Sequence, residues 1–148
     1  MSEMNLGGLD DQTANEEKVT NFQDAKKNRR PFHIWKVGDT EYKLKLKTDA
    51  IETLENKYRQ AVFTLVTNDM PPLAVMLTVV YAGLRDWQHG IKFDDMKKIY
   101  QKWVDEEGGN LMEFYAKVLM PMMAVSGFFT AKQAEEILSK TEDLDDAL

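Results

Sequence analysis

Residues 33–47 alternate apolar and polar side chains on either side of Gly38-Asp39, and this alternation constrains the fold more than any other feature. Alternate residues of a strand share one face, so the two runs predict an antiparallel hairpin. If Gly38 and Asp39 are the central turn residues, the facing strand pairs follow. On the apolar face these are Val37 with Thr40, Trp35 with Tyr42, and His33 with Leu44; on the other face Lys36 stands opposite Glu41.

A two-stranded hairpin is marginal alone, so its apolar face must pack on other elements. The chain supplies a helix at once, because EYKLKLKTDAIETLENKY changes from strand to helix spacing without glycine or proline. This predicted helix runs from about residue 48 to 65. Its apolar stripe comprises Ile51, Leu54, Tyr58, Ala61, Val62 and Leu65. Phe63 lies outside the stripe, about 150° from its centre at roughly 100° per residue.

Two more helices are predicted before residue 108. Pro71-Pro72 suit the first turn of a helix over LAVMLTVVYAGL, which is apolar nearly all round. A third helix begins near Asp94 and ends at Gly108-Gly109. Its narrow apolar stripe comprises Met96, Ile99, Tyr100 and Trp103.

The last two predicted helices each begin with a capping box. Asn110 and Glu113 open the helix LMEFYAKVLMPMMAVSG, which is again apolar nearly all round and which Pro121 should bend. Thr130 and Gln133 open a fifth helix that extends through about residue 138.

The predicted fold is mainly α, with about five helices and a small N-terminal β-hairpin packed on them. Residues 31–139 form one helical domain. Residues 1–30 are polar and have no apolar period, which predicts a disordered segment. Residues 140–148 form an acidic C-terminal tail; the alternative is a docking peptide that uses Leu144 and Leu148.

Composition excludes several classes of protein. There is no cysteine, so neither a disulfide framework nor a thiolate metal site is expected, and a reducing cytoplasm fits best. The N-terminus has neither the basic start nor the apolar stretch of an export signal. The nearly uncharged run at residues 70–84 is shorter than the roughly 20 residues that cross a bilayer. The net charge of −6 disfavours nucleic-acid binding, and we expect no membrane association.

No catalytic, cofactor or metal site can be assembled from these residues, and we expect a non-enzymatic protein. His33 and His89 could form a metal pair, but a core histidine and a solvated loop histidine are the favoured interpretation. Glu52 and Glu55 resemble an acid pair, but at helical spacing they more simply form a solvated face.

The lysines of the hairpin have two interpretations. Lys43, Lys45 and Lys47, with Lys36 nearby, could follow a phosphate backbone. Alternating lysines more commonly protect a strand edge from aggregation, and we favour that interpretation.

The nine methionines and the apolar helices point to a protein partner. Flexible thioethers suit surfaces that accept varied apolar partners, although they also fill cores. Two helices that are apolar all round present more apolar surface than one small domain is expected to bury. The candidate contact residues, chosen by helical position, are Phe63, Met120, Met123, Phe128 and Phe129.

The order of these elements resembles a known family. HIWKVGDTEYKLKL, IETLENKY, LAVMLTVVYAGL, a helix ending in EEGG and a segment closing in SGFF follow one another as in the tail assembly chaperones of long-tailed phages and of phage-like elements in Gram-positive bacteria. The resemblance covers about residues 31–130.

The resemblance implies a non-enzymatic chaperone that coats the tape measure protein in the host cytoplasm, keeps it soluble and helps recruit tail tube subunits. It also implies self-association. The acidic end ILSKTEDLDDAL fits the shorter of two products that this family often makes by frameshifting. The alternatives are an oligomeric structural or adaptor protein of the virion and a nucleic-acid-associated regulator that uses the lysine edge.

Overall fold

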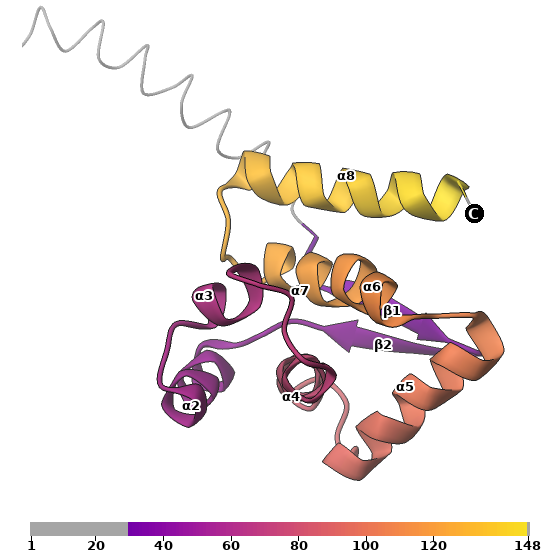
Figure 1. Ribbon diagram of the computed structural model, residues 1–148, viewed down its shortest axis with the longest axis horizontal. Helices are drawn as coiled ribbons and strands as arrows, with labels where there is room; N and C mark the ends of the chain where they lie inside the picture. The colour runs from indigo at the N-terminus through magenta and orange to yellow at the C-terminus, as the bar shows by residue number, and fades with distance from the viewer. Residues whose placement is uncertain (1–29, 148) are drawn as a thin grey trace, which may run out of the picture. The chain divides into compact units, whose positions relative to one another are not determined.

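A computed structural model of the chain describes residues 30–147, with side chains described through Thr141. This part is mainly helical and carries one small hairpin, as predicted (Figure 1). The elements are β1 (His33–Val37), β2 (Thr40–Leu44), α2 (Thr48–Tyr58), α3 (Val62–Thr67), α4 (Leu73–Leu84), α5 (Phe93–Glu107), α6 (Leu111–Glu113), η1 (Phe114–Leu119), α7 (Met120–Val125) and α8 (Ala131–Ala147). The predicted disordered segment, residues 1–30, lies outside the described residues except for Arg30.

The predicted hairpin register is confirmed at every pair, including Lys36 opposite Glu41. Gly38 has a φ of 62°, whereas Asp39 does not have a positive φ, which is the pattern of a turn with glycine at its first central position. The Gly38 N–H donates a hydrogen bond of 2.7 Å to the Glu107 carboxylate. The turn is therefore attached to the C-terminal end of α5.

The predicted single helix over residues 48–65 is wrong, because the chain breaks it into α2 and α3. Arg59 adopts a left-handed conformation with φ 55° and ends α2. The Glu55 carboxylate then accepts a hydrogen bond of 3.0 Å from the Val62 N–H and so caps the start of α3. Glu55 is thus a capping residue, so it does not simply share the solvated face that we expected for Glu52 and Glu55.

The segment between β2 and α2 is held by three hydrogen bonds to later elements. The Lys45 N–H donates to the Gly83 carbonyl at 3.0 Å, and the Trp87 indole N–H donates to the Lys45 carbonyl at 2.9 Å. The Leu46 N–H donates to the Ser126 hydroxyl at 2.9 Å. A Cβ on Gly83 would overlap the Met122 sulfur, so the close packing of α4 against Met122 at this position requires glycine.

Residues 111–125 form one continuous helix whose middle part, η1, is π-helical and ends two residues before Pro121. Proline has no N–H, and in an α-helix the group at position 121 would donate to the carbonyl of residue 117. Nε2 of His33 lies 2.7 Å from that carbonyl. Because the carbonyl only accepts, Nε2 must carry the proton. His33 is 9% exposed, which confirms the predicted core histidine on β1.

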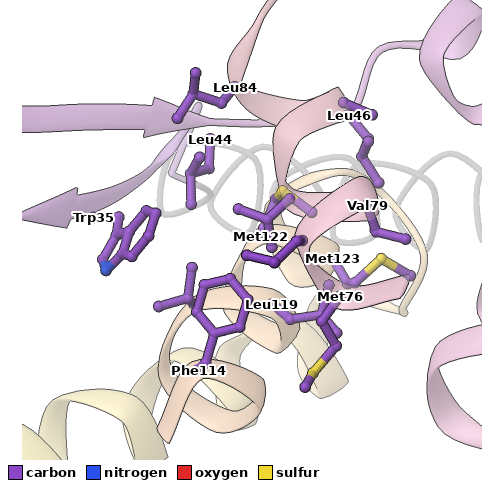
Figure 2. Close-up of a cluster of buried hydrophobic side chains, with 14 of the residues drawn as sticks. Trp35, Leu44, Leu46, Met76, Val79, Leu84, Phe114, Leu119, Met122 and Met123 are labelled. Atoms are coloured by element: carbon purple, nitrogen blue, oxygen red, sulfur yellow. The ribbon is translucent and has the colours of Figure 1, made fainter. Parts of the chain in front are cut away.

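The hydrophobic core joins the inner face of the hairpin to α4 and to the helix of residues 111–125. Figure 2 shows Trp35 of β1 facing Phe114, and their ring centroids are 5.5 Å apart. Met76 on α4 and Met122 on α7 are fully buried in the same cluster. The apolar character of these helices is therefore largely used in packing.

Helix α8 is longer than predicted, since it continues to Ala147 rather than ending near Leu138, and it includes most of the expected acidic tail. Its capping box at Thr130 and Gln133 is confirmed by bonds of 3.1 and 3.2 Å. Helix α8 packs along α7 (Figure 1). Ala124, Val125 and Ala134 are buried outside the main core cluster, as expected for residues at a contact between these two helices. None of the described helices is long and apolar enough to span a membrane.

Candidate protein-binding surface

The structure places one of the five predicted contact residues in the core. Met123 is fully buried, and Figure 2 shows it among core side chains that include Met76 and Val79. The expectation that Met123 contacts a partner is therefore wrong for this fold. The sequence misled because a helix that is apolar all round does not reveal which of its faces other helices cover.

The other four predicted residues keep some exposure. Phe63 on α3 is 43% exposed, and its ring lies 5.5 Å from that of Phe129 with an interplanar angle of 64°. Phe128 and Phe129 are half-buried against the core, and Met120 is half-buried. The structure therefore brings Phe63 and Phe129 together into an edge-to-face aromatic pair that is partly open to solvent.

Four more large apolar side chains are exposed that we did not select from the sequence. They are Ile34 at 43%, Met70 at 37%, Leu111 at 39% and Met112 at 67% exposure. Leu111 and Met112 form the first turn of the helix of residues 111–125. The sequence could have indicated the exposure of Leu111 and Met112 only through their position, because the first turn of a helix has few neighbouring elements to cover it.

Tyr115 connects this first turn to α3. Its hydroxyl donates a hydrogen bond of 2.8 Å to the Val66 carbonyl. Leu111 precedes Tyr115 by four residues and therefore lies on the same side of the helix, one turn earlier. Met70 follows Val66 by four residues along the chain. We define the exposed apolar set as four exposed residues, Phe63, Met70, Leu111 and Met112, together with the half-buried Phe129 that packs on Phe63.

The surroundings of this set offer little acid–base chemistry. Desolvation by burial raises the pKa of Tyr115, and it raises the pKa of Tyr100 in the same way. Both phenols therefore stay neutral at physiological pH. Among the residues whose side chains the structure describes, 30–141, there is no group of three or more histidine or acidic side chains placed to hold a metal ion.

The hairpin lysines do not form a free row. The Lys43 ammonium lies 5.4 Å from the centroid of the Phe32 ring, and the Lys47 ammonium lies 4.4 Å from that of Trp87. Phe32 and Trp87 in turn pack edge to face, with centroids 4.6 Å apart. Two of the lysines are therefore engaged with aromatic rings, an arrangement that favours a role in packing over phosphate binding.

Comparisons of the chain with models of protein families, with curated proteins and with solved structures find no match.

Proposed function

We propose that this chain is a tail assembly chaperone of a long-tailed phage or phage-like element. It binds the tape measure protein in the cytoplasm of the host, keeps it soluble and helps recruit tail tube subunits. The observation that carries the proposal is the exposed apolar set on an otherwise well-packed domain. The order of the elements over residues 31–130, which resembles that family, supports it.

The exposed apolar set suits a long helical partner. A helix that presents apolar residues at every third or fourth position needs a surface that accepts varied side chains without fixed hydrogen bonds. Met70 and Met112 supply flexible thioethers, and the Phe63–Phe129 pair supplies a firmer aromatic contact. The same set supports self-association when the partner is absent.

Co-expression tests the proposal. The tape measure protein encoded beside this chain should become more soluble when the two are produced together. Phe63→Ser with Met112→Ser should reduce that gain, because both side chains are exposed and their loss removes apolar contact. Ile34→Ser on the hairpin is the matched control, since Ile34 is as exposed as Phe63 but is not in the set.

An unchanged insoluble fraction of the tape measure protein on co-expression with the unaltered chain would refute the proposal. Equal loss of solubility with the Ile34→Ser control would refute the assignment of the contact to the exposed apolar set.

A further inference from the structure

A second surface lies between α2 and α4, where a groove of about 260 Å³ opens to solvent. Its apolar lining comes from Ala50, Leu54 and Ala82, which are buried, and from Phe93 at the start of α5. Drug-sized ligands and cofactors usually occupy about 300–1,000 Å³. The groove is smaller than that, and it suits one or two aliphatic side chains.

The neutral polar groups that line the groove already have partners within the domain. The Thr53 hydroxyl donates to the Asp49 carbonyl at 2.9 Å, and the Thr78 hydroxyl donates to the Ala74 carbonyl at 2.8 Å. The Tyr81 hydroxyl donates to the Ile91 carbonyl at 2.7 Å. These donors are satisfied, so the threonine and tyrosine side chains contribute mainly apolar surface to a ligand.

Two cations complete the lining, namely Lys57 on α2 and Arg85 at the end of α4. None of the lining residues is acidic. Within the described part of the chain neither cation forms an ion pair, and the Lys57 ammonium lies 5.7 Å from the centroid of the Tyr58 ring, a distant contact. An apolar floor with two exposed cations is complementary to an aliphatic side chain that lies beside a carboxylate.

We propose that this groove binds a segment of a partner protein that presents an aliphatic side chain next to Asp or Glu. The aliphatic side chain lies on Leu54 and Ala82, while the carboxylate pairs with Arg85 and Lys57. The planar guanidinium of Arg85 can hold a carboxylate through two parallel hydrogen bonds. The groove shares no residue with the exposed apolar set, so its occupancy is independent of the tail-chaperone proposal.

NMR titration of the full ¹⁵N-labelled chain tests the groove. The probe is an amidated helical peptide of Leu, Ala and Glu, and a matched probe carries Gln in place of Glu. The Glu probe should shift the backbone amides of Ala50, Leu54 and Ala82, and should bind more tightly than the Gln probe.

Charge-reversal variants test whether Lys57 and Arg85 contribute to binding of the Glu probe. Lys57→Glu with Arg85→Glu should weaken binding of the Glu probe by about tenfold or more, because like charges then face each other. Lys98→Glu with Lys132→Glu makes the same change of net charge at exposed positions outside the groove and should leave affinity within about twofold, since it changes mainly the long-range field. Thr53→Trp, which fills the groove from an exposed position, should abolish the amide shifts while thermal unfolding shows the fold intact.

Four results would overturn the proposal. One is the absence of shifts at the groove amides, and another is equal affinity for the Glu and Gln probes. A third is octanoate binding as tightly as the peptide, which would indicate a small fatty carboxylate as the ligand. The last is movement of the same amides with protein concentration alone, which would indicate a second copy of the chain as the occupant.

Discussion

At the scale of single residues, His33 connects strand β1 to a helix more than eighty positions away in sequence. Its Nε2 donates to the Lys117 carbonyl, the acceptor that a residue with an N–H at position 121 would serve in an α-helix. We therefore expect the proline and the histidine to be energetically coupled, because the proline removes a donor to this carbonyl and the histidine supplies one.

We expect His33→Ala to lower the free energy of unfolding by about 1–3 kcal/mol, because it removes a donor from a part-buried carbonyl. In a Pro121→Ala background the new N–H of residue 121 can donate to the Lys117 carbonyl in place of His33. His33→Ala should then lower the free energy of unfolding by less. Urea unfolding of the two single variants and the double variant measures this coupling. Additive losses would mean that the two residues act independently.

Tyr115 gives a second prediction at this scale. Its pKa is raised above the ordinary value of 10.0 by burial, so the folded state favours the neutral phenol. The stability that this preference supplies is complete below pH 10.0 and is lost as pH rises through the raised native pKa. Tyr115→Phe should therefore show a shallower loss of stability than the unaltered chain between pH 10 and pH 12, measured by thermal unfolding.

At neutral pH, Tyr115→Phe should lower the free energy of unfolding by about 0.5–1.5 kcal/mol, because it removes the hydrogen bond to the Val66 carbonyl. Tyr100→Phe is the control, since burial also raises the pKa of Tyr100 but no hydrogen bond from its hydroxyl is found in the described part. Identical costs for the two variants at neutral pH would argue against a contribution from the Val66 bond.

At the scale of elements, the break between α2 and α3 depends on Glu55. Its carboxylate caps α3 from the preceding helix, so the chain turns between Arg59 and Ala61 without leaving the Val62 N–H unpaired. This cap positions the short helix that carries Phe63.

Glu55→Ala should lower stability by about 0.5–2 kcal/mol through loss of the cap. Glu52→Ala, at an exposed position on the same helix, should have little effect. Denaturant unfolding compares the two variants, and amide hydrogen exchange should show faster exchange at Val62 only in Glu55→Ala. Equal exchange at Val62 in both variants would argue against the cap.

The hairpin could be predicted to the residue because both of its faces constrain the register, one through burial and one through the Lys36–Glu41 pair. The helix break could not be predicted, because Tyr58, Ala61 and Val62 keep helical spacing across it. The length of α8 was missed for a related reason: its last residues are acidic and have no apolar stripe to mark them as helical.

The exposure of the candidate contact residues was predicted only in part. Phe63 was selected because its position departs from the apolar stripe, and it is exposed. Met123 was selected by its position on a helix that is apolar all round, and it is buried, because burial on such a helix depends on which neighbours pack against it. That information lies in tertiary contacts such as the one between α7 and α8, and not in local sequence.

At the scale of the whole molecule, charge is unevenly distributed along the chain. From Ala131 onward there are two lysines and six acidic residues, whereas residues 31–130 carry 12 basic and 13 acidic side chains. Helix α8 is therefore strongly acidic and adjoins a nearly neutral body. This distribution disfavours non-specific attraction to nucleic acid, and it leaves apolar contact as the main source of the self-association that we propose.

We expect light scattering to give a mass above that of one chain, rising with concentration, because the exposed apolar set favours association. Phe63→Ser with Met112→Ser should lower that mass and reduce binding of a hydrophobic dye, at a temperature where the melting curve shows the variant to be folded. A strict monomer that binds no dye over a wide concentration range would contradict this prediction.

The bonds that join the hairpin to later helices also bear on how the chain folds during synthesis. The partners of His33 and Leu46 lie 84 and 80 residues further along the sequence, at Lys117 and Ser126. The strands leave the ribosome first, but they cannot complete their packing until the helix that carries these partners has emerged. Contacts of such long range slow folding. Trp35 therefore lacks its contact with Phe114 until that helix has emerged, and the lysines on the other face of the hairpin disfavour edge-to-edge aggregation in the meantime.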